Sequence, residues 1–151
     1  MSSRQAHVIF IVDPGLETVV WAHRGGFRAQ HDARVLPSGN LLLFDNGLHQ
    51  QGSRVLEFEP RTMEIVWQYG RPNEDLFSPN LSTAERLLNG NTLITESDRG
   101  RALEVTSLGD IVWEWRTPHT VVEDGTEMIS MVPEMLRLPP DTDISWAVRP
   151  R

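Results

Sequence analysis

The chain has 151 residues, 39% hydrophobic and 23% charged, which is ordinary for a single globular domain. Its 14 basic and 21 acidic side chains give a net charge of −7 without a basic cluster, so neither a nucleic acid nor a membrane surface is expected as a partner. The absence of cysteine excludes disulfides, thiolate metal sites and cysteine nucleophiles, and leaves the redox compartment open.

The N-terminal segment predicts one pair of strands within residues 7–23. Residues 8–12 are five consecutive apolar residues, too few for a signal-peptide core or a membrane span. We therefore expect a cytoplasmic location for the sequence as it stands, or a periplasmic one if it is a piece of a longer exported protein.

One sequence motif, in which turn residues are followed by a short apolar run and a tryptophan, occurs three times. Trp21, Trp67 and Trp113 close the three copies, and successive tryptophans are 46 residues apart. A fixed period of this length carried by strand-like segments predicts the blades of a β-propeller. Such regular recurrence favours packing between blades over stacking on a ligand for these side chains.

A second repeat begins with Leu36, Leu87 and Leu138, which are spaced by 51 residues and followed by turn residues. In the first two copies a Gly-Asn pair separates two strand-like runs, as in a tight turn. Further apolar runs follow each turn, so each repeat supplies four strands, lettered a to d from the propeller axis outward. The predicted runs are 31–36, 41–44, 54–58 and 64–67, then 83–87, 92–95, 101–105 and 110–113.

We predict a single, partial propeller domain over residues 1–151, all-β and built of four-stranded antiparallel blades. The domain would contain about three blades, which is half of a six-bladed ring. Three blades are too few to close into a ring by themselves. The rest would come from a longer chain of which this is a fragment, or from a second copy in a homodimer whose termini complete each other's split blades. The predicted division begins with strands c and d of a split blade at 7–23, followed by full blades at 31–69 and 82–115. Residues 116–151 would contain a last inner strand near 135–138, a short strand near 144–148 and the C-terminal tail.

The segment His31-Asp-Ala-Arg-Val-Leu-Pro-Ser-Gly-Asn40 and its continuation to Gly47 belong to a wider pattern that includes residues 77–87, 89–96 and 109–115. Together with residues 53–60 and the tail at 133–141, they resemble the C-terminal half of bacterial arylsulfotransferase-like β-propellers. The resemblance begins at about residue 8 and covers nearly the whole chain.

The resemblance implies a six-bladed propeller whose central funnel carries histidines that transfer a sulfuryl group between phenolic sulfate esters and phenols. It implies a histidine nucleophile, cationic groups that stabilise charge on oxygen, and no nucleotide donor, cofactor or metal. A phenolic sulfate or a phenol would be the small-molecule partner. Two alternatives stay open: a non-catalytic propeller used for binding or as a scaffold, and a quinoprotein-like propeller.

His31 is the candidate nucleophile or acid–base group, because it heads a predicted inner strand that would line the funnel. The equivalent positions in the other repeats hold Ser82 and Pro133. The alternative role for His31 is a structural hydrogen bond with Asp32 at the blade entrance.

Three further residues are candidates for binding substrate: Arg86, Ser82 and His49. Arg86 aligns with Val35, on the predicted His31 face, and could bind an anion, whereas alternation places Arg34 on the other face. His49 lies in a loop within a blade. The remaining histidines show no metal-ligand spacing, so no metal site is predicted.

Overall fold

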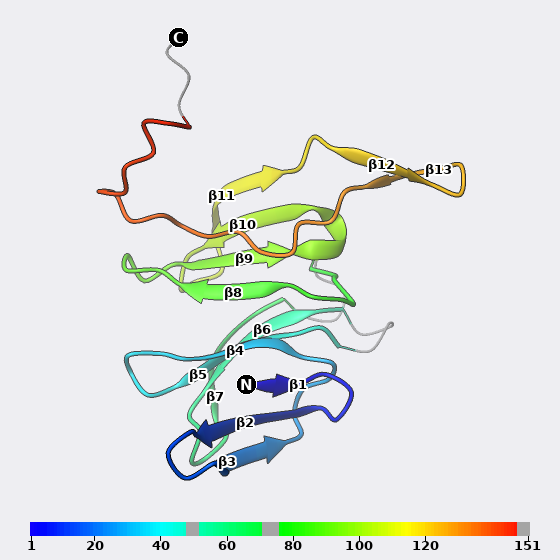
Figure 1. Cartoon of the computed structure of the whole chain (residues 1–151). Helices are drawn as coiled ribbons and strands as arrows, with labels where there is room; N and C mark the ends of the chain where they lie inside the picture. The colour runs from blue at the N-terminus through cyan, green and yellow to red at the C-terminus, as the bar shows by residue number, and fades with distance from the viewer. Residues whose placement is uncertain (48–51, 71–75, 148–151) are drawn as a thin grey trace.

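The computed structural model describes residues 1–47, 52–70 and 76–147. Regular structure in these residues is β, apart from the single 3-10 turn η1 (Ser97–Arg99), and no described helix is long enough to cross a membrane. The strands form four antiparallel sheets, and the three larger ones stack on one another in chain order (Figure 1). The predicted all-β fold is confirmed.

The second and third sheets in the stack have four strands each, in the order in which they occur along the chain. The second is formed by β4 (His31–Val35), β5 (Leu41–Asp45), β6 (Arg54–Phe58) and β7 (Ile65–Tyr69). The third is formed by β8 (Thr83–Arg86), β9 (Thr92–Glu96), β10 (Arg101–Val105) and β11 (Ile111–Arg116).

The turn that joins the first two strands of each of these sheets has the same construction. Leu36 N–H donates to Asn40 O and Leu87 N–H donates to Asn91 O, both at 2.8 Å. Gly39 and Gly90 have φ of 89° and 86°, a left-handed conformation that glycine adopts without strain. The Gly-Asn turns predicted from the 51-residue repeat are therefore present.

The first sheet contains one more strand than the sequence predicted. It has the order β1 (Ser2–Ser3), β2 (Val8–Asp13), β3 (Thr18–Arg24), and β1 pairs with β2 at the edge opposite β3. The Met1 ammonium donates to Phe10 O at 2.9 Å and holds this short strand in place. Hence this sheet lacks one strand relative to its four-stranded neighbours, where the sequence predicted that it would lack two.

The C-terminal region differs from its prediction. A separate hairpin, β12 (Thr120–Glu123) and β13 (Thr126–Ile129), follows the third sheet. Residues 135–138 form no strand, because no described strand pairs with them and the nearby prolines lack an N–H. Residues 144–147, expected as a short strand, form a turn closed by Ala147 N–H and Ile144 O at 2.9 Å; Val148 lies outside the described residues.

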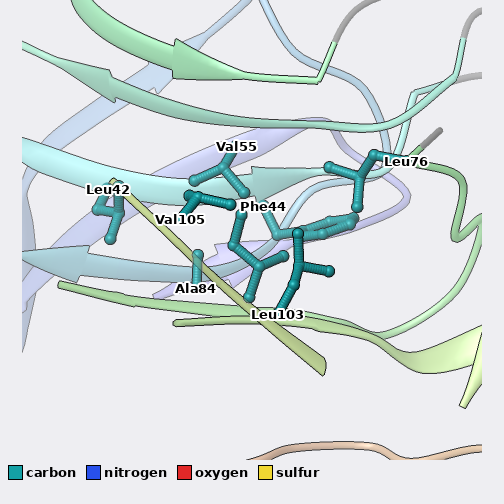
Figure 2. Packing of buried hydrophobic residues seen from close by; sticks show 8 residues of the cluster. Leu42, Phe44, Val55, Leu76, Ala84, Leu103 and Val105 are labelled. Atoms are coloured by element: carbon teal, nitrogen blue, oxygen red, sulfur yellow. The ribbon is translucent and has the colours of Figure 1, made fainter. Parts of the chain in front are cut away.

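Two apolar clusters hold the stack together, one in each interface between large sheets. The first sheet packs on the second through a cluster that includes Ile9, Phe27 and Phe58. The second packs on the third through a cluster whose side chains point toward one another from both sheets (Figure 2). That cluster contains Leu42, Phe44, Val55, Leu76, Ala84, Ile94, Leu103 and Val105, all at most 1% exposed.

The repeated tryptophans lie at the faces between layers. The Arg86 guanidinium lies 4.6 Å from the centroid of the Trp67 ring and forms an ion pair with Glu57 at 2.7 Å. Arg137, from the C-terminal segment, repeats this contact on Trp113, with its guanidinium 5.5 Å from the ring centroid. Trp67 therefore packs between the second and third sheets, as its spacing predicted, whereas Trp113 is 38% exposed beneath a segment that forms no strand.

Candidate functional site

His31 is the first residue of β4, immediately before a β-bulge. It pairs with Phe44 of β5, but the register shifts between His31 and Arg34. Asp32, within the bulge, has a φ of 51°. A bulge of this kind interrupts the alternation of side chains along a strand and redirects them, so the face of Arg34 could not be predicted by counting from His31.

The half-buried imidazole of His31 contacts the side chain of Asn46. Its Nδ1 lies 2.7 Å from Asn46 Oδ1. The Nδ2 group of Asn46 donates to Ser78 O at 2.7 Å and to Leu81 O at 2.8 Å. These contacts join the end of β5 to the segment that leads into β8, and they bring together residues far apart in the sequence.

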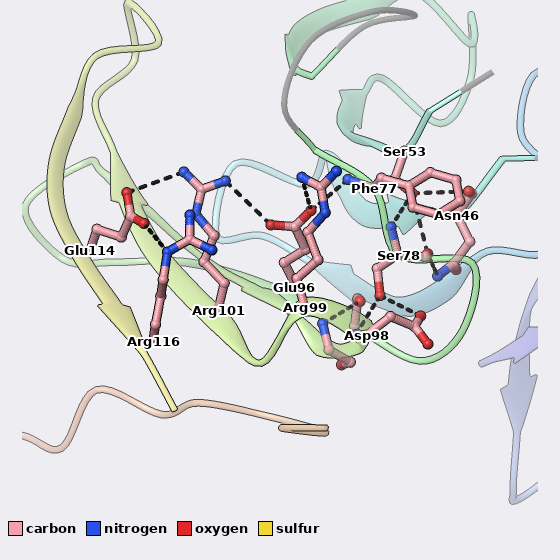
Figure 3. A network of polar contacts seen from close by, with 12 residues as sticks. Asn46, Ser53, Phe77, Ser78, Glu96, Asp98, Arg99, Arg101, Glu114 and Arg116 are labelled. Atoms are coloured by element: carbon pink, nitrogen blue, oxygen red, sulfur yellow. Dashed lines mark hydrogen bonds and ion pairs between the residues drawn. The ribbon is translucent and has the colours of Figure 1, made fainter. Parts of the chain in front are cut away.

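The segment that Asn46 binds is itself held by a buried polar network (Figure 3). Ser78 N–H donates to Ser53 Oγ at 2.9 Å, and Ser53 Oγ lies 3.0 Å from Asn46 O. On the other side, Ser78 Oγ donates to Asp98 Oδ2 at 2.8 Å. The His31–Asn46 pair therefore rests on groups in the loop before β6, in the link between the two sheets and in η1.

Asp32 does not pair with His31, so the structural alternative considered for this histidine is not the one present. Instead, the two carboxylate oxygens of Asp32 share one bifurcated bond from Arg34 Nε–H, at 2.8 and 2.9 Å, and Asp32 accepts another from Ala84 N–H at 3.0 Å. Burial raises the pKa of the Asp32 carboxyl above its ordinary value, while the Arg34 and Ala84 bonds act in the opposite direction. Arg34 also reaches Glu134 at 3.0 Å, which links β4 to the C-terminal segment.

The position equivalent to His31 in the third sheet is occupied by Ser82, which is buried. Ser82 Oγ accepts a bond from Ser97 N–H at 3.1 Å and lies 3.4 Å from Asn80 O. Ser97 stands 51 residues after Asn46 and donates through its hydroxyl to Pro133 O at 3.2 Å. The third sheet thus has two hydroxyls where the second has an imidazole and an amide.

Arg86, predicted as an anion-binding residue, is engaged in packing between sheets. Besides its contacts with Trp67 and Glu57, its Nη1 donates to Gly90 O at 3.1 Å. In the contact between the first and second sheets, apolar residues take the places of these charges: Val35 stands where Arg86 does and Ile11 where Glu57 does. Both line a cavity of about 30 Å³ beside Trp21. These contacts give Arg86 a structural role that the sequence prediction did not consider.

The other predicted candidates and the remaining histidines contribute less to this region. His49 lies outside the described residues. His7 Nδ1 accepts a bond from Ala29 N–H at 2.9 Å, and His23 stacks on Trp21 and makes an edge contact with Phe27. Among the residues that the structure describes, no group of three or more acidic or histidine side chains is placed to hold a metal ion.

In both four-stranded sheets the second strand ends in a carboxylate that binds the linker entering the sheet. Asp45 accepts from Arg28 N–H at 2.7 Å and from Arg54 Nε at 2.9 Å. Glu96, 51 residues later, accepts from Phe77 N–H at 2.6 Å and pairs with Arg101 at 3.3 Å (Figure 3). Each carboxylate fixes the linker that enters its sheet.

Asn46, which contacts the His31 imidazole, is not among the residues predicted from the sequence. It is 2% exposed and directly follows Asp45, so it reads as the end of a buried strand. The signal that could have found it is the 51-residue repeat, which aligns Asn46 with Ser97 just as it aligns His31 with Ser82. Two paired positions that change together between repeats suggest a contact between them.

Residues 1–118 match the family described as Arylsulfotransferase (ASST). Among solved structures, the chain is similar to a protein of unknown function from Bacteroides caccae, with a TM-score of 0.53 and 16% sequence identity. That match covers 79% of this chain and 44% of the other, so the chain spans less than half of that relative's length. At this identity the likeness concerns the fold alone. No curated protein matches the sequence.

Proposed function

The chain belongs to the arylsulfotransferase family, and we propose that it takes part in sulfuryl transfer from phenolic sulfate esters to phenols, with His31 as the nucleophile. The observation that carries the proposal is the environment of His31. One ring nitrogen is held by Asn46, and the described residues supply no hydrogen-bond partner to the other. A neutral imidazole with one free nitrogen is a nucleophile near neutral pH.

The proposed reaction has two displacements at sulfur and uses no external redox partner. In the first, the free nitrogen of His31 attacks the sulfur of the donor ester, the bond between sulfur and the aryl oxygen breaks, and the aryloxide leaves with the bonding electrons and takes a proton from water. In the second, the oxygen of a phenol attacks the same sulfur, the nitrogen–sulfur bond breaks, and the phenolic proton passes to water. The imidazole is regenerated.

The proposed architecture is a six-bladed propeller, in which the three stacked sheets are successive blades. β4 and β8 would then be inner strands, and residues 133–138 would occupy the inner position of the next blade. Support comes from the repeated layer contact, because Arg137 lies against Trp113 and Glu104 as Arg86 lies against Trp67 and Glu57. In this arrangement His31 would face the central funnel.

The rest of the ring would come from a second copy of the chain or from further blades of a longer protein. A homodimer would have a mass of about 34.4 kDa, twice the 17.2 kDa of one chain. Light scattering on the purified chain distinguishes the two sources. A folded species at the monomer mass would exclude closure by a second copy and leave the longer chain as the source.

Release of 4-nitrophenol from 4-nitrophenyl sulfate, in the presence of a phenol acceptor, tests the transfer. We expect release by the wild-type protein and its loss in His31→Gln, which replaces the imidazole by an amide of similar length. His119→Gln is the matched control, since His119 lies in an exposed segment beside the hairpin β12–β13. Equal release by wild type and His31→Gln would reject His31 as the nucleophile.

The acceptor phenol separates transfer from simple hydrolysis. If His31 carries the sulfuryl group, adding the phenol increases 4-nitrophenol release and yields the sulfated acceptor, which mass spectrometry detects. Absence of release from an assembled, folded protein would instead favour the non-catalytic binding or scaffold function.

A further inference from the structure

The surroundings of His31 contain one side chain whose role the proposed reaction does not itself specify. Asn46 contacts the imidazole on one side and two backbone carbonyls on the other. From this geometry we infer that Asn46 is a positioning residue that fixes the tautomer of His31, with the proton on Nδ1 and the lone pair on Nε2. The inference deepens the proposed function, on which it rests for the identity of the reacting side chain.

The orientation of the Asn46 amide follows from the chemistry of its partners. The oxygens of Ser78 and Leu81 lie 2.7 and 2.8 Å from one terminal atom of this amide. A backbone carbonyl only accepts hydrogen bonds, so the atom facing both must be the NH₂ nitrogen, which has two hydrogens to donate. The reverse orientation would set an oxygen against two oxygens and would leave all three without a proton to share.

The tautomer of His31 follows from the amide. With both amide hydrogens directed at carbonyls, Asn46 presents only its acceptor oxygen to the imidazole, 2.7 Å from Nδ1. A ring nitrogen without hydrogen would place one lone pair against another at this distance. Nδ1 therefore carries the proton, and in the neutral ring Nε2 is the nitrogen with the free lone pair.

Burial keeps Asn46 in this orientation. The residue is 2% exposed, so water cannot replace the bonds that a rotation would break. The carbonyl of Ser78 is fixed as well, because Ser78 is bonded to Ser53 on one side and to Asp98 on the other (Figure 3). The amide is thus preorganised before any ligand arrives.

This tautomer suits the proposed chemistry. When Nε2 bonds to sulfur, the ring becomes an imidazolium that retains its Nδ1 proton, and that proton already has an acceptor in Asn46 Oδ1. No proton has to leave the ring in either displacement, and the ring keeps one orientation throughout. The role corresponds to that of the side chain that orients the histidine in hydrolase triads, here filled by a neutral amide.

Nitrogen NMR of the resting protein tests the inference without reference to activity. The full chain, labelled with ¹⁵N-histidine, is examined at a pH well above the ordinary histidine pKa of about 6.5. The His31 signals are identified by their loss in His31→Gln. We expect a pyrrole-type shift at Nδ1 and a pyridine-type shift at Nε2 for His31. The opposite assignment, or an averaged pair of shifts, would overturn the inference.

Asn46→Leu supplies the second measurement, because leucine is close to asparagine in size but cannot hydrogen-bond. We expect the His31 shifts to move toward a mixture of tautomers and 4-nitrophenol release to fall by about 10- to 100-fold. Ser97→Ala is the matched control, since it removes a partly buried hydrogen bond at the equivalent position of the third sheet and should leave the His31 shifts unchanged. If Asn46→Leu does not fold, the wild-type spectrum alone still decides.

The two proposals fail separately in these experiments. A protein with the Nδ1–H tautomer but no sulfuryl transfer would refute the proposed function and leave the positioning role of Asn46 intact. An active protein with the Nε2–H tautomer, or an Asn46→Leu variant with unchanged His31 shifts, would refute the positioning role alone.

Discussion

The second and third sheets share a framework and differ at the pair of residues where chemistry is proposed. In both, a carboxylate at the end of the second strand binds a linker N–H and an arginine, and a tryptophan lies under an arginine from the segment that follows in the chain. At the head of the first strand, however, the second sheet has His31 with Asn46, and the third has Ser82 with Ser97. A reactive group can therefore be placed on one repeat without changing the contacts that build the stack.

The largest change in stability is expected from the carboxylates that both sheets share. Glu96 is fully buried and binds Phe77 N–H and Arg101, which is itself 4% exposed. Glu96→Ala should lower the free energy of unfolding by about 3–5 kcal/mol, because it leaves a buried guanidinium without one of its carboxylates. Urea denaturation measures the change.

Asp45→Ala is the matched variant in the second sheet. Its partner Arg54 is 32% exposed and can turn to water, so the expected loss is smaller, about 1–3 kcal/mol. Equal losses at the two positions would show that burial of the arginine does not distinguish the sheets.

The layer contacts form the next comparison. Trp67 is half-buried against the apolar cluster between the two sheets, and its Nε1–H donates to Ser107 O at 2.9 Å. Trp113 is 38% exposed and is covered by a segment without a strand. We expect Trp67→Ala to cost about 3 kcal/mol and Trp113→Ala about 1 kcal/mol in thermal or urea unfolding. The reverse order would mean that Trp113 is buried by a further layer in solution.

The site itself can be converted into its counterpart. The double change His31→Ser and Asn46→Ser gives the second sheet the pair found in the third. We expect loss of 4-nitrophenol release with a stability cost of about 1–2 kcal/mol, from the hydrogen bonds to Ser78 and Leu81. Circular dichroism and the release assay measure both effects. Retained activity in a folded double variant would place the chemistry elsewhere.

The smallest expected effect concerns pH. Hydrogen bonds from Asn91 and Asn89, together with the charge of Arg137, lower the pKa of the Glu104 carboxyl below its ordinary value of 4.5. A lowered pKa in the folded state gives stability that is present above pH 4.5 and is lost as the pH falls through the lowered value. The stability difference between wild type and Glu104→Gln should shrink over that range in urea titrations. A difference independent of pH would contradict the lowered pKa.

The periodicity of the sequence predicted most of the strands, but it did not predict the contacts between residues from different repeats. His31 could be selected because it heads a strand in a known repeat, yet Asn46 could not, since a buried asparagine at a strand end has no distinctive local pattern. The 51-residue alignment placed Arg86 on the His31 face, and only the layer contact with Trp67 and Glu57 revealed its packing role. Arg34 was assigned a face by alternation, which the bulge at Asp32 interrupts.

The sequence by itself determined what depends on neighbours along the chain: alternating apolar runs, Gly-Asn turns with left-handed glycines, and two repeat periods that divide the chain into sheets. Tertiary structure decided what depends on partners from other repeats. Ser2 and Ser3 form a strand because β2 pairs with them. Residues 135–138 form no strand, because none of the described strands pairs with them. The proton position inferred for His31 is likewise set by an amide that two distant carbonyls orient, since hydrogen bonds act through space and carry no signature in local sequence.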